Sequence, residues 1–135
     1  MRRAALACLL ITALGVPALA GGARRPRVEL RATPRMAFLA SDVLVAAQLV
    51  GGDEHEDFYC PEVEWEFGDG SRSRHQADCE PFSPVTPLER RFTARHAYRQ
   101  PGDYEVRVTF RRSDRALAVA TTHVRVYFGS AVASQ

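Results

Sequence analysis

The chain has 135 residues, of which 46% are hydrophobic, and a formal net charge of +2 at pH 7. Arg2 and Arg3 account for both units of this charge, so the remaining residues are formally neutral. A neutral balance gives no reason to expect nucleic acid or an anionic membrane as a partner. The length suits one domain with its own hydrophobic core.

The first twenty residues have the pattern of a secretory signal peptide. Arg2 and Arg3 form a positive start, residues 4–14 are apolar, and residues 18–20 are Ala-Leu-Ala. This small-x-small site predicts cleavage after Ala20. An uncleaved N-terminal anchor is the alternative, although the apolar run is short for a spanning helix. No second apolar run of that length follows, so we expect a secreted or periplasmic mature chain without a membrane span.

Residues 21–27 are polar and rich in arginine, and we expect them to form a flexible lead-in. Residues 28–32 alternate and predict a first strand, which Pro34 interrupts. Residues 43–50 predict a buried strand that ends at Gly51 and Gly52. The acidic loop 51–59 follows, and Asp53 and Asp57 are calcium candidates in it. Its acidic residues lack the D-x-D-x-D-G spacing of a calcium loop, which favours a solvated acidic loop.

Residues 62–67 form the clearest half-buried strand pattern. Trp65 and Phe67 share one face with Val63, and three glutamates occupy the other. Asp69-Gly70 is a strong signal for a two-residue hairpin turn. With that turn, the returning segment 71–77 places its arginines on the face that Trp65 occupies. We therefore expect this segment to be a short edge strand that twists away from the core.

Two cysteines remain once Cys8 leaves with the signal peptide. Cys60 lies as far before Asp69 as Cys79 lies after Gly70, so the two face each other across the predicted hairpin. An even pair in an oxidising compartment favours a disulfide. A zinc site is the alternative, and the lack of C-x-x-C spacing makes it the weaker one.

The second half of the chain predicts three further strands. Residues 81–87 hold three prolines and must be a loop. Residues 88–98 alternate as a strand, and Pro101-Gly102 is a corner. Residues 103–110 alternate next, and Ser113-Asp114 marks a turn before a long strand, 116–128. The apolar parity of this last strand switches, which predicts a bulge near Thr121-Thr122.

Two motifs identify the fold. Residues 65–71 are Trp-Glu-Phe-Gly-Asp-Gly-Ser, and residues 96–108 follow the pattern H-x-Y-x-x-P-G-x-Y-x-V-x-V. Together they resemble the PKD domain, an immunoglobulin-like antiparallel β-sandwich of about seven strands found in extracellular and cell-surface proteins. The resemblance implies an all-β domain over residues 28–128, with a short tail at 129–135. The motif residues are Trp65, Phe67, Gly68, Asp69, Gly70, His96, Tyr98, Gly102, Tyr104 and Val106.

The motif residues have structural interpretations. Trp65 is the expected core aromatic, and Tyr104 resembles a tyrosine corner, whose hydroxyl ties a loop backbone to the sheet. His96 is expected to hydrogen-bond near the 68–70 turn; a role as ligand or base is the alternative. Asp69 is expected to accept turn N–H groups, with calcium binding as the alternative.

We therefore predict a non-enzymatic interaction module that binds protein or carbohydrate at the cell surface. A structural or calcium-stabilised accessory domain is one alternative, and a small enzyme is another. No catalytic residue, cofactor or metal is predicted, because no G-x-S-x-G, H-E-x-x-H or P-loop pattern occurs. The enlarged loops 51–60 and 71–95 are the expected location of any specificity. An exposed aromatic row would favour polysaccharide, whereas a charged face would favour a protein partner or a structural role.

Overall fold

The computed structural model describes residues 24–53 and 55–129. The predicted signal peptide, its cleavage site at Ala20 and nearly all of the predicted tail lie outside these residues. In the part of the chain described, no helix is long and apolar enough to cross a membrane.

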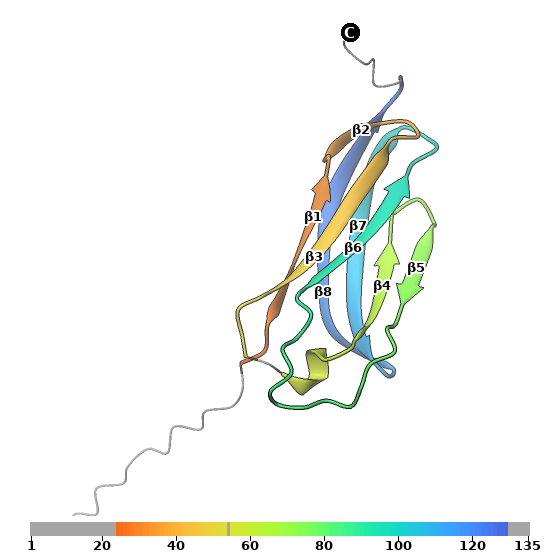
Figure 1. Cartoon of the computed structure of the whole chain (residues 1–135). Helices are drawn as coiled ribbons and strands as arrows, with labels where there is room; N and C mark the ends of the chain where they lie inside the picture. The colour runs from red at the N-terminus through yellow and green to blue at the C-terminus, as the bar shows by residue number, and fades with distance from the viewer. Residues whose placement is uncertain (1–23, 54, 130–135) are drawn as a thin grey trace, which may run out of the picture.

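The described residues form two packed β-sheets, so the predicted all-β sandwich is confirmed (Figure 1). The three-stranded sheet has the order β1-β3-β6, with β1 Arg27–Thr33, β3 Asp42–Val50 and β6 Arg91–Ala97. The five-stranded sheet has the order β2-β8-β7-β4-β5, with β2 Met36–Phe38, β8 Arg115–Tyr127, β7 Gly102–Arg112, β4 Glu62–Glu66 and β5 Arg72–His75. A short 3-10 helix, η1, spans Glu56–Phe58. Neighbouring strands are antiparallel except for the parallel pair β2–β8.

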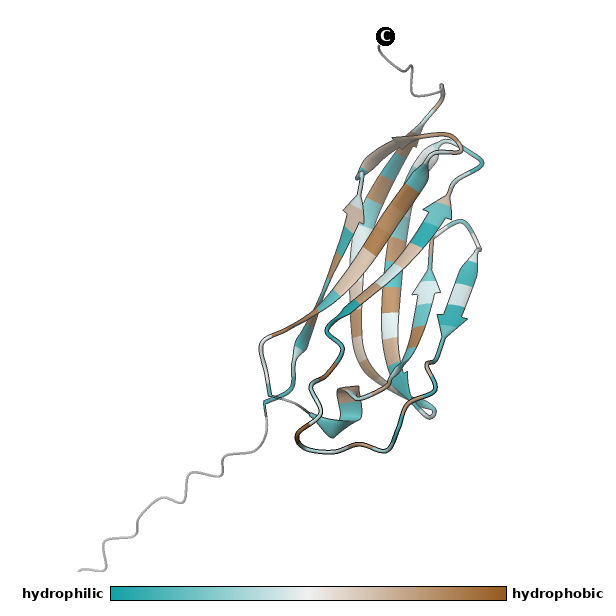
Figure 2. Ribbon diagram, in the orientation of Figure 1, coloured by the Kyte–Doolittle hydropathy of each residue, from teal (hydrophilic) through white to brown (hydrophobic). Residues whose placement is uncertain are grey.

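The core lies between the two sheets and follows the period-2 pattern of the strands. In β3, Val43, Val45 and Leu49 are buried, and in β7 Val108 and Phe110 are buried. Figure 2 shows the resulting alternation of brown and teal along the strands. Because successive side chains point to opposite faces, strands such as β3, β4 and β7 each contribute one apolar face to the core, whereas β5 is exposed throughout. Trp65, predicted as the large core aromatic, is 3% exposed.

The strand β2 is an addition to the predicted pattern. The chain leaves β1 at Thr33, passes a cis peptide bond before Pro34, and enters β2 beside β8 in the other sheet. Three residues are too few to show a period-2 pattern, so the sequence reveals only the interruption at Pro34.

The predicted two-residue turn at Asp69-Gly70 is wrong, because the hairpin turns through residues 68–70. Phe67 N–H donates to the Ser71 carbonyl, 3.1 Å, and Trp65 faces Ser73 in the ladder. Gly68 and Gly70 have φ values of 86° and 88°, which only glycine adopts readily. A Cβ on Gly68 would also lie 2.6 Å from the Glu105 carbonyl oxygen.

This one-residue difference in register moves the side chains of β5 to the opposite face from the predicted one. Arg72 and Arg74 lie opposite Glu66 and Glu64 on the outer face, and each pair forms a salt bridge. The predicted conflict between these arginines and the core therefore does not arise. The prediction that β5 is a short edge strand is confirmed.

The bulge in β8 is present but lies earlier than predicted. The register shifts where Phe110 faces Ala118 and Arg111 faces Ala116, so Leu117 is the extra residue. The switch of parity therefore precedes Val119, which points outward and is 53% exposed. The prediction near Thr121-Thr122 is wrong because the apolar Val119, which lies before that point, is already on the outer face.

Candidate functional site

A groove of about 870 Å³ runs along the open side of the sandwich, between β5 and β6. We call it the β5–β6 groove. Among the described residues, β5 pairs only with β4 and β6 only with β3, so two strand edges border it (Figure 1). Its floor includes the core residues Val63, Trp65 and Phe67. Its volume falls in the range of ligand pockets, roughly 300–1,000 Å³.

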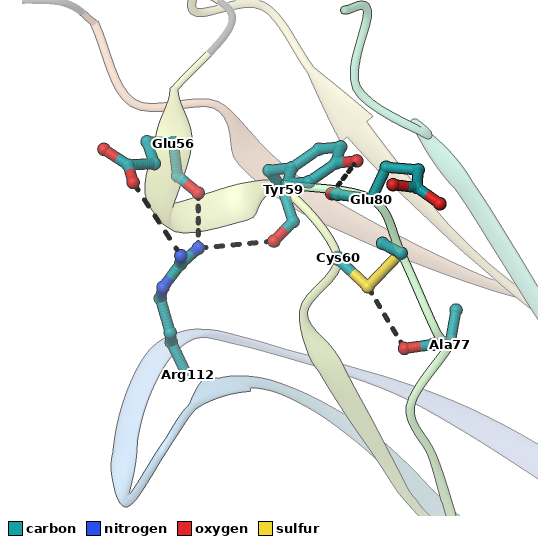
Figure 3. Close-up of a disulfide and its surroundings, with 7 residues drawn as sticks. Glu56, Tyr59, Cys60, Ala77, Glu80 and Arg112 are labelled. Atoms are coloured by element: carbon teal, nitrogen blue, oxygen red, sulfur yellow. Dashed lines mark hydrogen bonds and ion pairs between the residues drawn. A yellow bond between two sulfur atoms is a disulfide. The ribbon is translucent and has the colours of Figure 1, made fainter. Parts of the chain in front are cut away.

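The disulfide closes one end of the groove. Cys60 and Cys79 are bonded, with their Cα atoms 6.2 Å apart, so the predicted disulfide is confirmed. Both cysteines line the groove. The Tyr59 hydroxyl donates to the Glu80 carbonyl, 2.6 Å, beside the disulfide (Figure 3). The enlarged loops 51–60 and 71–95 are thus joined at the groove, although the bonded cysteines lie beyond the regular β4–β5 ladder.

The other end of the groove lies at His96, which contacts the 68–70 turn. His96 Nε2 donates to Asp69 Oδ2, 2.7 Å, and Asp69 Oδ1 accepts from Ser71 N–H, 2.9 Å. The His96 ring stacks on Phe67 with ring centroids 4.2 Å apart. Burial acts to raise the pKa of Asp69, but the hydrogen bonds from His96 and Ser71 outweigh it and hold this pKa below its ordinary value. The arrangement fixes the turn to β6.

Two tyrosines form hydrogen bonds to backbone carbonyls in and near this turn. The buried Tyr98 hydroxyl donates to the Phe67 carbonyl, 2.9 Å, and burial raises the pKa of Tyr98. The Tyr104 hydroxyl donates to the Gln100 carbonyl, 2.8 Å, which is the bond of a tyrosine corner. The two rings stack, with centroids 4.2 Å apart. Of the remaining motif residues, Gly102 begins β7 and Val106 is buried within it.

The acidic loop lies at the disulfide end of the sandwich, and its carboxylates contact arginines. Asp57 forms salt bridges with Arg25, 3.3 Å, and Arg115, 3.1 Å. Asp53 accepts the backbone N–H of Arg24, 2.9 Å. The described residues contain no group of three or more metal-ligating side chains. The calcium candidates Asp53, Asp57 and Asp69 therefore lie in separate protein contacts.

The Asp69–His96 pair also bears on the enzyme alternative. A serine nucleophile would need its hydroxyl on the histidine. Ser71 contacts Asp69 instead, and no hydrogen bond joins Ser71 to His96 within residues 24–53 and 55–129. Asp69 and His96 together order the turn.

The two strand edges of the groove differ in charge. On β5, Arg72 and Arg74 are paired with glutamates across the ladder. On β6, Arg91 and Arg95 are exposed, and neither forms an ion pair in the described part of the chain. Their cross-strand neighbours on β3 are Gln48 and Leu44, which are uncharged. The β6 edge therefore carries positive charge that the domain does not balance locally.

Arg91, Arg95 and Ser73 were not among the site residues predicted from the sequence. Their alternation with Phe92 and Ala94 in residues 91–95 was a visible signal that the arginines point outward. A two-residue turn would put Ser73 on the outer face. The turn has three residues, 68–70, so Ser73 lies on the same face as Trp65. That β6 is an edge strand depends on sheet order, which the sequence does not display.

The comparisons with known proteins agree with this fold. The PKD domain family model matches residues 28–126. No curated protein matches the chain. Among solved structures, the PKD domain of an M14-like peptidase from Thermoplasmatales archaeon SCGC AB-540-F20 is similar, with a TM-score of 0.54 and 15% identity; the match covers 78% of this chain and 98% of that one.

Two further solved structures are similar. A CARDB domain from Pyrococcus furiosus, solved in complex with di-metal ions, has a TM-score of 0.50 and 17% identity, covering 78% of this chain and 97% of its own. A superoxide reductase from Ignicoccus hospitalis has a TM-score of 0.49 and 10% identity, covering 77% and 83%. At these identities the likeness to the two archaeal PKD and CARDB domains shows the fold alone, whereas the family model spans most of the chain. The chain belongs to the PKD domain family.

Proposed function

We propose that the mature chain is a secreted or periplasmic, non-enzymatic interaction module that binds a protein at the cell surface through the β5–β6 groove. The observation that carries this proposal is the groove itself, about 870 Å³ in volume and open along two strand edges. The disulfide supports an oxidising compartment, where such bonds persist. Membership of the PKD family supports the same extracellular setting.

Protein is favoured over carbohydrate by the outer faces of the sheets. In the described part of the chain, the outer face of β4 and its neighbours carries ion pairs, such as Glu64 with Arg74 and Arg111. Among the described residues, the large exposed aromatic side chains are Phe38, Tyr127 and Phe128, which lie where β2 pairs with β8 and do not line the groove. Sugar rings bind on exposed aromatic platforms, and such a platform is what a polysaccharide-binding face would require.

A structural accessory domain is the second candidate, and one observation favours it. Met36, Phe38, Tyr127 and Phe128 are exposed at the end of the sandwich where β2 and β8 lie side by side. Met36 is 68% and Phe128 77% exposed. Adjacent exposed apolar side chains suit contact with a neighbouring domain or chain. This cluster is far from the groove in sequence, so variants can separate the two candidates.

The test fills the groove without disturbing the core. Ser73 is exposed and lies opposite Trp65 on the face that lines the groove. The Ser73→Tyr domain and a control, Thr121→Tyr on the exposed outer side of β8, are immobilised beside the wild-type domain. Each is exposed to envelope proteins of the source cell and to an array of polysaccharides. We expect wild type and Thr121→Tyr to retain the same protein and Ser73→Tyr to lose it.

Two results would contradict the proposal. Retention of polysaccharide would make the domain a carbohydrate binder. Equal retention of protein by all three domains, lost on Phe128→Ser instead, would favour the accessory role of the exposed apolar cluster. Circular dichroism of each variant confirms that a loss of binding is not a loss of fold.

A further inference from the structure

The edge of β6 has the features of a strand template. We propose that it accepts an extended peptide as a fourth strand of the three-stranded sheet, and that this peptide alternates apolar with acidic residues. The inference rests on the proposed function and names the chemical class of the partner. Three observations carry it: the direction of the β6 backbone groups, the apolar floor of the groove, and the charge of Arg91 and Arg95.

The backbone groups of β6 divide into two sets. Leu49 N–H donates to the Arg90 carbonyl, 2.8 Å, and this bond continues the β3–β6 register. In an antiparallel ladder, bonded and non-bonded pairs alternate. Phe92, Ala94 and His96 therefore direct their N–H and C=O groups toward β3. Arg91, Thr93 and Arg95 direct theirs toward the groove, where a further strand would meet them.

The inner side of such a strand would face apolar surface. All of residues 91–96 line the groove, together with Val63, Trp65 and Phe67 from the opposite sheet. On the far wall, Ser71 and Ser73 are small, which leaves room between β5 and β6. Alternate side chains of an added strand point to opposite faces. One set would thus enter the groove, and apolar side chains fit that floor.

The outer set would lie beside the arginines of β6. Arg91 and Arg95 are four residues apart and lie on one strand face, with Thr93 between them on that face. Opposite charges directly across a ladder stabilise the pairing of two strands. Acidic residues on the outer face of the peptide would therefore pair with both arginines. Glu89 is a carboxylate that also lines the groove, and it lies beyond the end of β6.

The edge of β5 is a poorer template for the same peptide. It has four residues, and salt bridges to Glu66 and Glu64 already engage Arg72 and Arg74. A second copy of this chain is also disfavoured at β6. Symmetric pairing of two β6 strands centred on Thr93 would set Arg91 of one copy opposite Arg95 of the other, and like charges there are repulsive.

The experiment uses a fluorescein-labelled, acetylated peptide of four Val-Glu repeats and the oxidised domain. Anisotropy titrations at low salt give the dissociation constant. Three matched peptides separate the contributions: Val-Lys repeats, a block peptide of the same composition, and Val-Glu repeats N-methylated at alternate residues. We expect the alternating acidic peptide to bind at least about tenfold more tightly than each of the others, because only it offers strand hydrogen bonds and acidic residues on one face.

Variants of the domain locate the binding edge. Arg91→Gln/Arg95→Gln should weaken the peptide about 3- to 30-fold, the range expected for two exposed charge pairs. The matched control, Arg72→Gln/Arg74→Gln, should change it less than about twofold. On binding, amide hydrogen exchange should slow at Arg91, Thr93 and Arg95 and stay unchanged at Arg72 and Arg74. That pattern is specific to strand addition at β6.

Each contrary result overturns the inference. Equal binding of the block peptide would show electrostatic attraction without strand pairing. Equal weakening by both arginine pairs would move the contact to β5. Dimerisation in light scattering that Thr93→Pro abolishes would make a second copy the occupant. No binding of the alternating peptide at millimolar concentration, while Ser73→Tyr still abolishes capture of a protein, would leave the proposed function standing and this inference wrong.

Discussion

The two long sides of the sandwich differ in whether a strand of the same chain covers the edges of the sheets. On one side, the chain passes from β1 to β2 through Pro34 and Arg35, so the edge of β8 is covered by a strand of the same chain. Arg125 N–H donates to the Arg35 carbonyl, 2.9 Å, beside this crossing. On the other side, the chain passes from β5 to β6 through residues 76–90, which run around the end of the sandwich near η1 (Figure 1).

The length of the crossing determines what each side can do. A short crossing keeps the chain beside the strands, where its backbone groups pair with the neighbouring edge. A long, proline-containing crossing runs around the end and leaves both edges without a covering strand. The β5–β6 groove is therefore a consequence of the enlarged 71–95 segment. The open side keeps its core because the disulfide and the Asp69–His96 contact hold its two ends.

The largest effect should come from the floor of the open side. Trp65→Ala removes a buried aromatic that is 3% exposed and should lower the free energy of unfolding by about 3–5 kcal/mol. Denaturant unfolding measures it. Val119→Ala, on the outer face of β8 and 53% exposed, is the control and should change stability by less than about 0.5 kcal/mol. An unchanged stability for Trp65→Ala would mean that the groove floor is a binding surface and not part of the core.

Loss of the disulfide should have the next largest effect. The bond joins residues 19 apart in sequence. In the chain-entropy account, its removal by Cys60→Ala/Cys79→Ala costs about 3 kcal/mol. Hydrogen exchange should also rise at the disulfide end of the groove more than beside β2. Mass spectrometry of the exported wild-type protein should find no free thiol, and two free thiols in correctly exported material would contradict the pairing.

The disulfide was predicted correctly from the sequence, whereas the register of the strands next to it was not. Cys60 and Cys79 are bonded as predicted, yet the register used to relate them is one residue off. The bond tolerates this because both cysteines lie outside the regular ladder. The orientation of the β5 side chains does depend on the register, because a shift of one residue exchanges the faces of Arg72 and Ser73. Gly68 was predicted as a turn residue, but the register was derived from a turn of two residues, Asp69 and Gly70; with a φ of 86°, Gly68 makes the turn three residues long.

The features that depend on sheet order were beyond the sequence. Core positions such as Val106 and Val108 follow from alternation alone, and they are buried as expected. The short strand β2 and the edge position of β6 depend on which strands become neighbours in space. The local pattern of apolar and polar residues does not determine which strands become neighbours. The charge of Arg91 and Arg95 became informative only once β3 was known to place Gln48 and Leu44 opposite them.

The two tyrosines should differ in their contribution to stability. Tyr98→Phe removes a hydroxyl that satisfies the buried Phe67 carbonyl and should cost about 1–3 kcal/mol. Tyr104→Phe removes a hydroxyl bonded to the Gln100 carbonyl at the surface, where water can replace it. It should cost about 0.5–1 kcal/mol. Thermal unfolding of both variants measures the difference. Equal costs would show that the 98–104 corner acts as one unit.

The Asp69–His96 contact predicts a smaller, acid-dependent effect. The pKa of Asp69 is lower in the folded chain than its ordinary value of 3.8. Its contribution to stability is therefore complete above that value and is lost as pH falls through the folded pKa. Between about pH 4 and pH 2, wild type should lose stability more steeply than Asp69→Asn. Denaturant melts across this range measure the slopes. Parallel slopes would mean that the contact does not couple to folding.

Calcium should have the smallest effect, and we expect the thermal melts with millimolar calcium and with chelator to coincide. The reason lies in the contacts of the candidate ligands: Asp57 is held by two arginines, and Asp69 by His96 and Ser71. A metal that binds only the folded chain would raise stability by about 2.7 kcal/mol at a hundredfold excess over Kd. Such a shift is easily measured in a domain of this size. A shift of several degrees that Asp69→Asn abolishes, while Asp57→Asn leaves it intact, would place the metal at the 68–70 turn. The open side would then be held by an ion as well as by the disulfide, and the balance would move toward a calcium-stabilised accessory domain.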